Sequence, residues 1–148
     1  MAKLIPITEN HIPQIEEWIK ADEWHKNDPT WSAEGLLTGN GALSFCLADD
    51  EGPTCFVILY DEGKMLRLST QFAPEEIVSK RRLVTALLST GIPGIIQFGK
   101  DKDYKGIVYE SENESLINFM SKQGFKPVGG LDYALIFENP RLITDERG

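Results

Sequence analysis

The chain has 148 residues, of which 41% are hydrophobic and 26% are charged, as in one soluble globular domain with its own core. Fifteen Lys and Arg residues against 23 Asp and Glu residues leave a net charge of −8. This charge argues against nucleic-acid binding, which needs a basic face, and it is compatible with amine substrates. The sequence contains neither a run of ~18 apolar residues that could span a membrane nor a signal-peptide core. We therefore expect a cytoplasmic protein with no membrane partner.

The cysteines and histidines show no metal-binding or redox pattern. Cys46 and Cys55 fall in predicted strands, where we expect them to be small buried hydrophobic residues. The two His and two Cys residues lack the spacing of zinc ligands, so no metal site is predicted. No nucleophile motif, P-loop or dinucleotide-binding glycine pattern is present either.

The N-terminal part of the chain is predicted to form one strand and two helices. Residues 4–7 are apolar and suit a short strand. Residues 11–21 are predicted to be helical because apolar side chains recur there at helical spacing. Those side chains are Ile12, Ile15, Trp18 and Ile19. A shorter helix is expected over residues 32–37, and the Thr38-Gly39-Asn40-Gly41 run should end it.

Three antiparallel strands are predicted next, over residues 43–48, 54–60 and 65–72. The second is nearly all apolar, which is typical of a central strand. The third alternates apolar and polar residues, which is typical of a half-buried strand. Turn-forming residues separate the three strands.

A long helical region follows the third strand. Pro74 cannot continue a central ladder, because it has no N–H group. Residues 75–88 are then predicted to be a loop that enters a helix. Gly91 is expected to interrupt this helix, and Pro93 to restart it toward Lys100.

The C-terminal part is predicted to form a buried strand at residues 107–109, a capped helix and a closing strand at residues 133–137. Two caps are open for the helix: Ser111 in a capping box with Glu114, or Asn113. Gly124 is placed where a helix ends in a left-handed residue, and Phe125 can pack back on the last turn. Residues 126–130 are expected to include a turn, and residues 139–148 to form a polar tail.

The strand and helix before Gly124 resemble the end of the GCN5-related N-acetyltransferase (GNAT) domain. In that family the pattern is Asn-x-x-Ala-x-x-x-Tyr, followed by Gly-Phe. Asn113, Leu116, Ile117, Gly124 and Phe125 are in register with it, and Met120 stands at the Tyr position.

The resemblance implies a single α+β domain over residues 1–138. Its fold would be a twisted mixed sheet of about six to seven strands with helices on both faces. Two neighbouring strands, residues 65–72 and 107–111, would splay apart.

The same resemblance implies that acetyl-CoA is the co-substrate and that its pyrophosphate binds at the start of the helix after the fourth strand. Arg82 and Val84 stand where the family has glycines. Two interpretations remain open: the amides and cations of residues 80–84 bind the phosphates, or this basic run is a solvated helix start. Asn113 could contact the pantetheine arm or cap its helix. The residues expected to bind the coenzyme are Phe72, Ala73, Lys80, Arg81, Arg82, Leu83, Val84 and Asn113.

Acetyl transfer also needs a base for the amine and an acid for the thiolate. Because Met120 has no proton to give, Tyr109 and Ser121 are the candidate acids. Glu110, at the end of the buried strand, is the first candidate base, ahead of Glu75 and Glu76. For each carboxylate a surface or capping role is the alternative. His25 is a further candidate, with a surface loop position as the alternative, in a stretch that covers the acceptor side of the cleft in the family.

The first functional hypothesis is acetyl transfer from acetyl-CoA to an amine on a small molecule or a protein. Met120 and the missing glycines favour a second hypothesis, in which a degenerate, non-catalytic GNAT-like domain serves as an interaction or assembly module. The sequence leaves open whether the chain forms a homodimer.

Overall fold

The computed structural model describes residues 2–38 and 43–137, without the side chains of residues 36–38. The polar tail predicted for residues 139–148 lies outside the described residues. So does most of the break predicted after residues 32–37.

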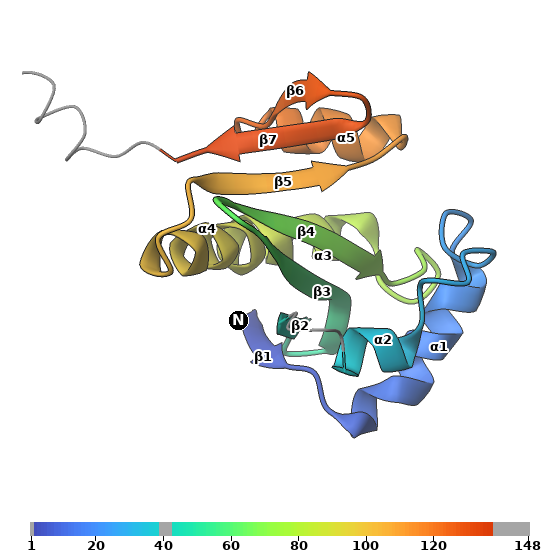
Figure 1. Cartoon of the computed structure of the whole chain (residues 1–148). Helices are drawn as coiled ribbons and strands as arrows, with labels where there is room; N and C mark the ends of the chain where they lie inside the picture. The colour runs from blue at the N-terminus through green and yellow to red at the C-terminus, as the bar shows by residue number, and fades with distance from the viewer. Residues whose placement is uncertain (1, 39–42, 138–148) are drawn as a thin grey trace, which may run out of the picture.

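The described chain folds into a mixed sheet of seven strands with helices on both of its faces (Figure 1), which confirms the predicted α+β fold class. The strand order is β1-β2-β3-β4-β5-β7-β6. The strands are β1 (Lys3–Pro6), β2 (Leu43–Asp49), β3 (Gly52–Glu62), β4 (Met65–Phe72), β5 (Gly106–Glu110), β6 (Lys126–Gly129) and β7 (Asp132–Ile136). The helices are η1 (Glu9–His11), α1 (Ile12–Ala21), α2 (Ala33–Thr38), α3 (Lys80–Ala86), η2 (Leu87–Gly91), α4 (Ile92–Asp101) and α5 (Glu114–Ser121).

Two hydrophobic clusters fix the layers of the fold. One lies between α1, α2 and the sheet, with Trp18 packed on Phe56 at a ring separation of 4.9 Å. The other lies on the opposite face, where the helices from α3 to α5 cover β3, β4 and β5. The apolar strand β3 contributes to both clusters, which agrees with the central position predicted for it.

The single parallel strand pair of the sheet, β4 with β5, is short. It is registered only at Met65 with Gly106, Leu66 with Ile107 and Arg67 with Val108. Beyond this register the two strands part, as Figure 1 shows. The backbone of β4 from residue 68 onward therefore faces an opening in the sheet, which agrees with the splay predicted for this pair.

The helical region after β4 differs from the prediction in its middle. Gly91 does not interrupt the helix: η2 is a π-helical turn that joins α3 to α4. A Cβ atom on Gly91 would lie 3.0 Å from Leu47 Cδ2, so the glycine allows this turn to pack closely on β2. π-Helical turns often occur at functional sites.

The C-terminal elements follow the prediction with one correction. Asn113 is the N-cap of α5, because its Oδ1 accepts hydrogen bonds from the amides of Ser115 and Leu116. Gly124 has φ of +104°, the left-handed geometry predicted for it. Residues Lys126–Gly129 form β6, an exposed edge strand that was not predicted and in which Pro127 is tolerated, and the predicted turn follows it at Gly130.

Candidate functional site

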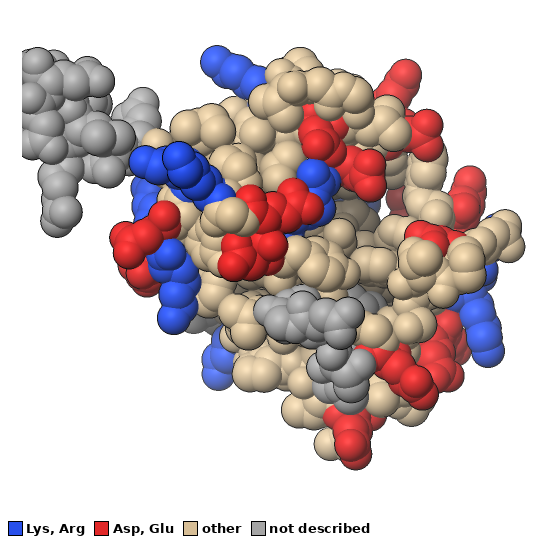
Figure 2. Space-filling model, in the orientation of Figure 1, with Lys and Arg blue, Asp and Glu red and all other residues tan. Residues whose placement is uncertain are grey.

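A cleft of about 480 Å³ opens where β4 and β5 part. We call it the central cleft. Its walls are the end of β4, the segment that follows β5, and the loop between α1 and α2. Figure 2 shows a hollow near the centre of this face with acidic side chains on its rim. The volume is within the ~300–1,000 Å³ of small-molecule sites.

A second hollow of about 350 Å³ adjoins the central cleft. We call it the adjoining groove. It extends between the start of α3 and the start of α5, and it shares Trp24, Phe72 and Asn113 with the cleft. Because they share these residues, the two hollows together form one elongated site, and the gap between β4 and β5 lies in its central part.

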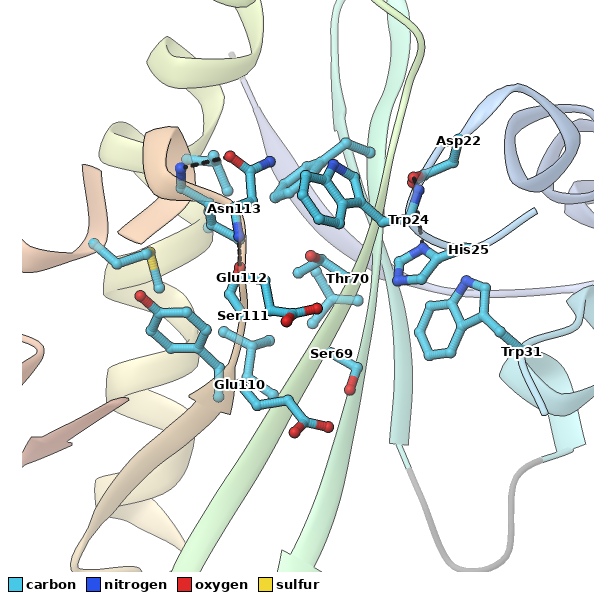
Figure 3. A pocket seen from close by; sticks show the side chains of 18 of the residues that line it. Asp22, Trp24, His25, Trp31, Ser69, Thr70, Glu110, Ser111, Glu112 and Asn113 are labelled. Atoms are coloured by element: carbon cyan, nitrogen blue, oxygen red, sulfur yellow. Dashed lines mark hydrogen bonds and ion pairs between the residues drawn. The ribbon is translucent and has the colours of Figure 1, made fainter. Parts of the chain in front are cut away.

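The α1–α2 loop is joined to β4 by a polar network around Gln71, which is 0% exposed. Gln71 Oε1 accepts a hydrogen bond from Trp31 Nε1 at 2.9 Å and lies 2.9 Å from His25 Nδ1. Gln71 Nε2 donates to Asp22 Oδ2 at 2.8 Å and to the carbonyl of Phe72 at 3.1 Å. These bonds fix the loop over one wall of the cleft, where Asp22, His25 and Trp31 lie opposite Glu110 and Glu112 (Figure 3).

His25 and Asp22 form a close pair within this network, with Nδ1 and Oδ2 3.2 Å apart. Burial lowers the pKa of His25, but hydrogen bonds with Asp22 and Gln71 and the charges of Asp22 and Asp28 outweigh it and raise that pKa above its usual value. Burial raises the pKa of Asp22, but its bonds with His25, the Trp24 amide and Gln71 outweigh it and lower that pKa. The pair therefore favours a charged Asp22 beside a basic imidazole.

Two buried side-chain atoms have no hydrogen-bond partner among the described residues: Tyr109 Oη and Trp18 Nε1. Both residues line the site, Tyr109 in the central cleft and Trp18 in the adjoining groove. Burial raises the pKa of Tyr109 to about 12, so the hydroxyl keeps its proton at neutral pH. Because buried polar groups normally have partners, these two atoms are available to hydrogen-bond a water or a bound molecule.

Exposed carboxylates line the mouth of the central cleft: Asp28, Glu110 and Glu112. In Figure 3, Glu110 and Glu112 point from the β5 side of the cleft toward Ser69 and Thr70 of β4. The rim is therefore suited to a positively charged ligand.

Arg67 makes ion pairs at the end of the β4–β5 register, where the two strands are still hydrogen-bonded. Arg67 Nη1 and Nη2 donate to the two carboxylate oxygens of Asp132 at 3.2 and 3.0 Å, and Arg67 Nε donates to Glu62 at 2.7 Å. The bidentate pair joins β4 to β7 across β5 at the last registered residue. It therefore supports the sheet where the opening begins.

The residues predicted to bind the coenzyme separate into two groups. Lys80, Leu83 and Val84 line the adjoining groove. Arg81 and Arg82 instead line a hollow on another side of α3. The other predicted residues, Phe72, Ala73 and Asn113, also line the groove.

Arg82 is occupied by an ion pair rather than directed at the groove. Its Nε and Nη2 donate to the carboxylate of Asp49, both at 2.6 Å, and Nη2 also donates to the Gly52 carbonyl at 3.1 Å. The side chain of Ser79 caps the helix by accepting from the Arg82 amide. The basic run therefore places one side chain, that of Lys80, in the groove wall.

Some of the candidate proton-transfer residues line the site and others lie outside it. Glu110 and Tyr109 line the central cleft, and Glu75 lines the adjoining groove. Ser121 is exposed and lines neither hollow, and the same is true of Glu76. Ser121 misses the cleft because a neighbouring helical residue points about 100° away, and it is Met120 that faces inward.

The sequence interpretation missed Asp22 and Gln71. A helix end followed by Asp22 and, three residues on, His25 was the local signal for a carboxylate–imidazole pair. The alternation of apolar and polar residues in β4 places Gln71 among the polar positions of the strand. The α1–α2 loop packs over it there, so it is buried rather than exposed to solvent. No pattern within the sequence links residue 71 to residues 22–31, because the contact depends on tertiary packing.

The described residues contain no cluster of His, Cys, Asp and Glu side chains that could hold a metal ion. Within the same ranges, no helix is both long and apolar enough to cross a membrane.

Comparisons with known proteins find similar structures but no sequence match. No family model and no curated protein matches the chain. It superposes on ribosomal-protein-S18-alanine N-acetyltransferase from Escherichia coli with a TM-score of 0.68 at 15% identity, over 95% of this chain and 97% of that one. It superposes on aminoglycoside acetyltransferase AAC(6')-Ib in complex with coenzyme A with a TM-score of 0.69 at 13% identity, over 100% of both chains. For an acetyltransferase of the GNAT family from Staphylococcus aureus Mu50, the TM-score is 0.69 at 13% identity, over 93% of this chain and 100% of that one.

These similarities establish the fold, which is that of the GNAT acetyltransferases, and they confirm the predicted resemblance at that level. Because one fold can support several functions, the activity has to be argued from the site.

Proposed function

We propose that this protein transfers an acetyl group from acetyl-CoA to an amine. The observation that carries the proposal is the open edge of β4: its register with β5 ends at Arg67, and its remaining backbone lines the central cleft. An unpaired strand edge inside a cleft favours an extended ligand that contains amide groups. The pantetheine arm of coenzyme A is such a ligand.

The residues of the adjoining groove fit the coenzyme. Apart from the Arg82 amide, which the Ser79 side chain caps, the first-turn amides of α3 have no helical acceptors and form the positive end of a helix dipole, which favours a pyrophosphate. Lys80 adds a cation at this point. Asn113 uses Oδ1 for capping, so its side-chain NH₂ is the group that would donate to the arm. Val84 narrows the groove where the family has glycine.

Tyr109 is the proposed acid of the reaction. Acetyl-CoA supplies an activated acyl group and a thiolate leaving group. The Tyr109 hydroxyl keeps its proton and lacks a partner among the described residues, so it is available to donate to the sulfur. This role compensates for Met120 at the position where the family has a tyrosine.

The acceptor is proposed to be an amine that carries further positive charge. Asp28, Glu110 and Glu112 line the mouth of the cleft and would attract such a molecule. Glu110 is also the candidate base named from the sequence, acting directly or through water. The aromatic rings of Trp24 and Tyr60, which line the same cleft, can contact the cation through their faces.

The test measures thiol release from acetyl-CoA with three acceptors: an aliphatic diamine, a neutral monoamine and an amino acid with a free carboxylate. The diamine should react fastest, and a Glu110→Gln/Glu112→Gln variant should lose this preference. Glu114→Gln is a matched control, since Glu114 is exposed on α5 and lines neither hollow. Absence of acceptor-dependent thiol release with all three classes would contradict the proposal.

The second candidate function is that of a non-catalytic interaction module. It is favoured by exposed apolar side chains on the β6–β7 edge, where Val128, Leu131 and Ile136 are 59%, 46% and 61% exposed. An exposed edge strand with apolar side chains is a surface for self-association. Light scattering of the purified protein tests for a homodimer, and Val128→Lys should dissociate it if this edge is the interface.

A further inference from the structure

The loop between α1 and α2 places the His25 imidazole in the wall of the central cleft and packs against one side of the ring. His25 is held between Gln71, Asp22 and the ring of Trp31, whose centroid is 4.6 Å from its own. Its side chain is 27% exposed, and it lines the central cleft. The imidazole is thus fixed in place while one side remains open to a ligand.

The hydrogen bonds of the network determine which imidazole nitrogen carries the proton. Trp31 Nε1 can only donate, so the oxygen of the Gln71 amide must face it. The Gln71 nitrogen correspondingly faces two acceptors, Asp22 Oδ2 and the Phe72 carbonyl. His25 Nδ1 therefore lies between two acceptor oxygens, at 2.9 Å and 3.2 Å.

With Nδ1 protonated, the neutral imidazole has its lone pair on Nε2. Figure 3 shows the ring with its other nitrogen directed away from Asp22 and toward the side of the cleft on which Thr70 is drawn. Among the described residues, no hydrogen bond engages Nε2. A carboxylate that orients an imidazole in this way is the arrangement of a general base.

We propose that His25, oriented by Asp22 and Gln71, is the base that removes the first proton from the acceptor amine. This inference rests on the proposed function, and it assigns to His25 the role for which the sequence favoured Glu110. Glu110 is exposed at the mouth and has no hydrogen bond to orient it among those described. Glu110 then serves to attract the ammonium group.

The proton balance of the step is complete. An ammonium group gives one proton to His25 Nε2, and the freed nitrogen lone pair forms the C–N bond with the thioester carbonyl carbon as the C–S bond breaks. The nitrogen then loses a second proton, which replaces the one that Tyr109 donates to the thiolate. His25 returns its proton to solvent. The products are the amide, the free thiol and one proton.

Several charged and titratable groups set the basicity of His25. Asp22 and Asp28 belong to its own loop and favour the imidazolium form. Glu110 and Glu112 face it from the β5 side, and Tyr60 lines the same cleft from β3. All five groups are neutral or negative, and among the described residues no Lys or Arg lines the central cleft. Lys26, on the same loop, is exposed and is not part of the cleft wall.

The first test is independent of catalysis. The chain has two histidines, so ¹⁵N-detected imidazole spectra can be assigned with a His11→Gln variant. His25 should titrate above an ordinary histidine and show the Nδ1–H tautomer at high pH. Asp22→Asn should lower the midpoint of that titration. An Nε2–H tautomer, or a midpoint that does not respond to Asp22→Asn, would overturn the proposal.

The second test uses the pH dependence of acetyl transfer. His25→Gln should lower kcat/KM about 10²–10⁴-fold near neutral pH, with recovery toward pH 10, where a primary amine loses its proton unaided. Asp22→Asn should move the rising limb of the profile to lower pH. His11→Gln is the control, because His11 is bonded to Thr8 in η1 and lines neither hollow.

The outcomes separate this inference from the proposed function. If the wild-type protein transfers acetyl groups and His25→Gln retains both its rate and its pH profile, the assignment of His25 is wrong and the proposed function stands. If the wild-type protein transfers none to any acceptor, the proposed function fails, while the imidazole spectra still report on the tautomer. A uniform loss in His25→Gln at every pH would indicate a structural role and would also overturn the proposal.

Discussion

The two ends of the elongated site are built in different ways. At the end formed by the α1–α2 loop, side chains make the structure: Gln71 is fully buried and bonds to Asp22, Trp31 and the Phe72 carbonyl, with His25 beside it. At the other end, the start of α3 offers main-chain groups and one cation, since the neighbouring Arg82 is bonded to Asp49.

Under the proposed function, this difference explains how the adjoining groove would bind a coenzyme without the glycines of the GNAT pattern. A strand edge and a helix start provide donors and acceptors from the backbone, whatever the side chains are. At the end covered by the α1–α2 loop, the proposed contacts to the acceptor come from side chains, so its specificity depends on particular residues. We therefore expect substitutions at the acceptor end to have large effects, and those at the coenzyme end to have graded ones.

Removal of the Tyr109 hydroxyl should have the largest effect. Tyr109→Phe should lower kcat about 10²–10⁴-fold, as for a lost general acid. Stability should not fall, because the lost hydroxyl has no partner among the described residues, and leaving such a group buried costs about 1–3 kcal/mol. Rates and denaturant unfolding measure the two parts. Tyr133→Phe, on the ring stacked at 5.5 Å, is the control, and a large loss of stability in Tyr109→Phe would contradict the account.

Disruption of the Gln71 network should come second. Gln71→Leu leaves Trp31 Nε1 and Asp22 without partners they now have, and we expect a loss of about 1–3 kcal/mol in the free energy of unfolding. Gln97→Leu is the matched control, since Gln97 is exposed on α4 and bonds only to Asp101 in its own helix. Equal changes in the two variants, measured by urea unfolding, would show that the network does not stabilise the loop.

Introduction of a glycine at the coenzyme end should have a smaller and mixed effect. Val84→Gly should cost about 1 kcal/mol of stability, as glycine does in a helix, while widening the groove and tightening CoA binding. Thr85→Gly, one residue on and outside the groove, should cost the same without any gain. Calorimetric titration with CoA measures the affinity of each variant. Equal affinities of Val84→Gly and Thr85→Gly would show that the Val84 side chain does not obstruct CoA binding.

Removal of the ion pair between Asp49 and Arg82 should have the smallest effect, a change in stability that is confined to acidic pH. Hydrogen bonds from Arg82 lower the pKa of Asp49 to about 2. Its folded pKa is below the unfolded value of ~3.9, so its contribution is present above pH 4 and is lost as the pH falls toward 2. Asp49→Asn should therefore flatten the pH dependence of stability between pH 4 and 2. An unchanged slope in thermal unfolding would show that the pair contributes nothing.

Local patterns in the sequence predict most of the fold, because they indicate the helices, the central strand β3 and the two possible caps of α5, of which Asn113 is the one that the structure shows. The prediction was wrong at Gly91, where a π-helical turn continues the helix, and it did not include β6, whose proline and glycine are tolerated because it is an edge strand. The site was harder to predict. Asp22 and Gln71 are 49 residues apart in sequence, and a side-chain network of that kind has no local signature.

The most direct test of the central claim is thermal unfolding of the protein with and without CoA. A ligand at about 100 times its dissociation constant adds ~2.7 kcal/mol to the native state, which raises Tm by several degrees in a domain of this size. The account predicts such a shift in the wild-type protein. It also predicts a smaller shift in Lys80→Glu, whose side chain lines the groove, and a full shift in Arg81→Glu, whose side chain does not. Absence of any shift at millimolar CoA would contradict the account.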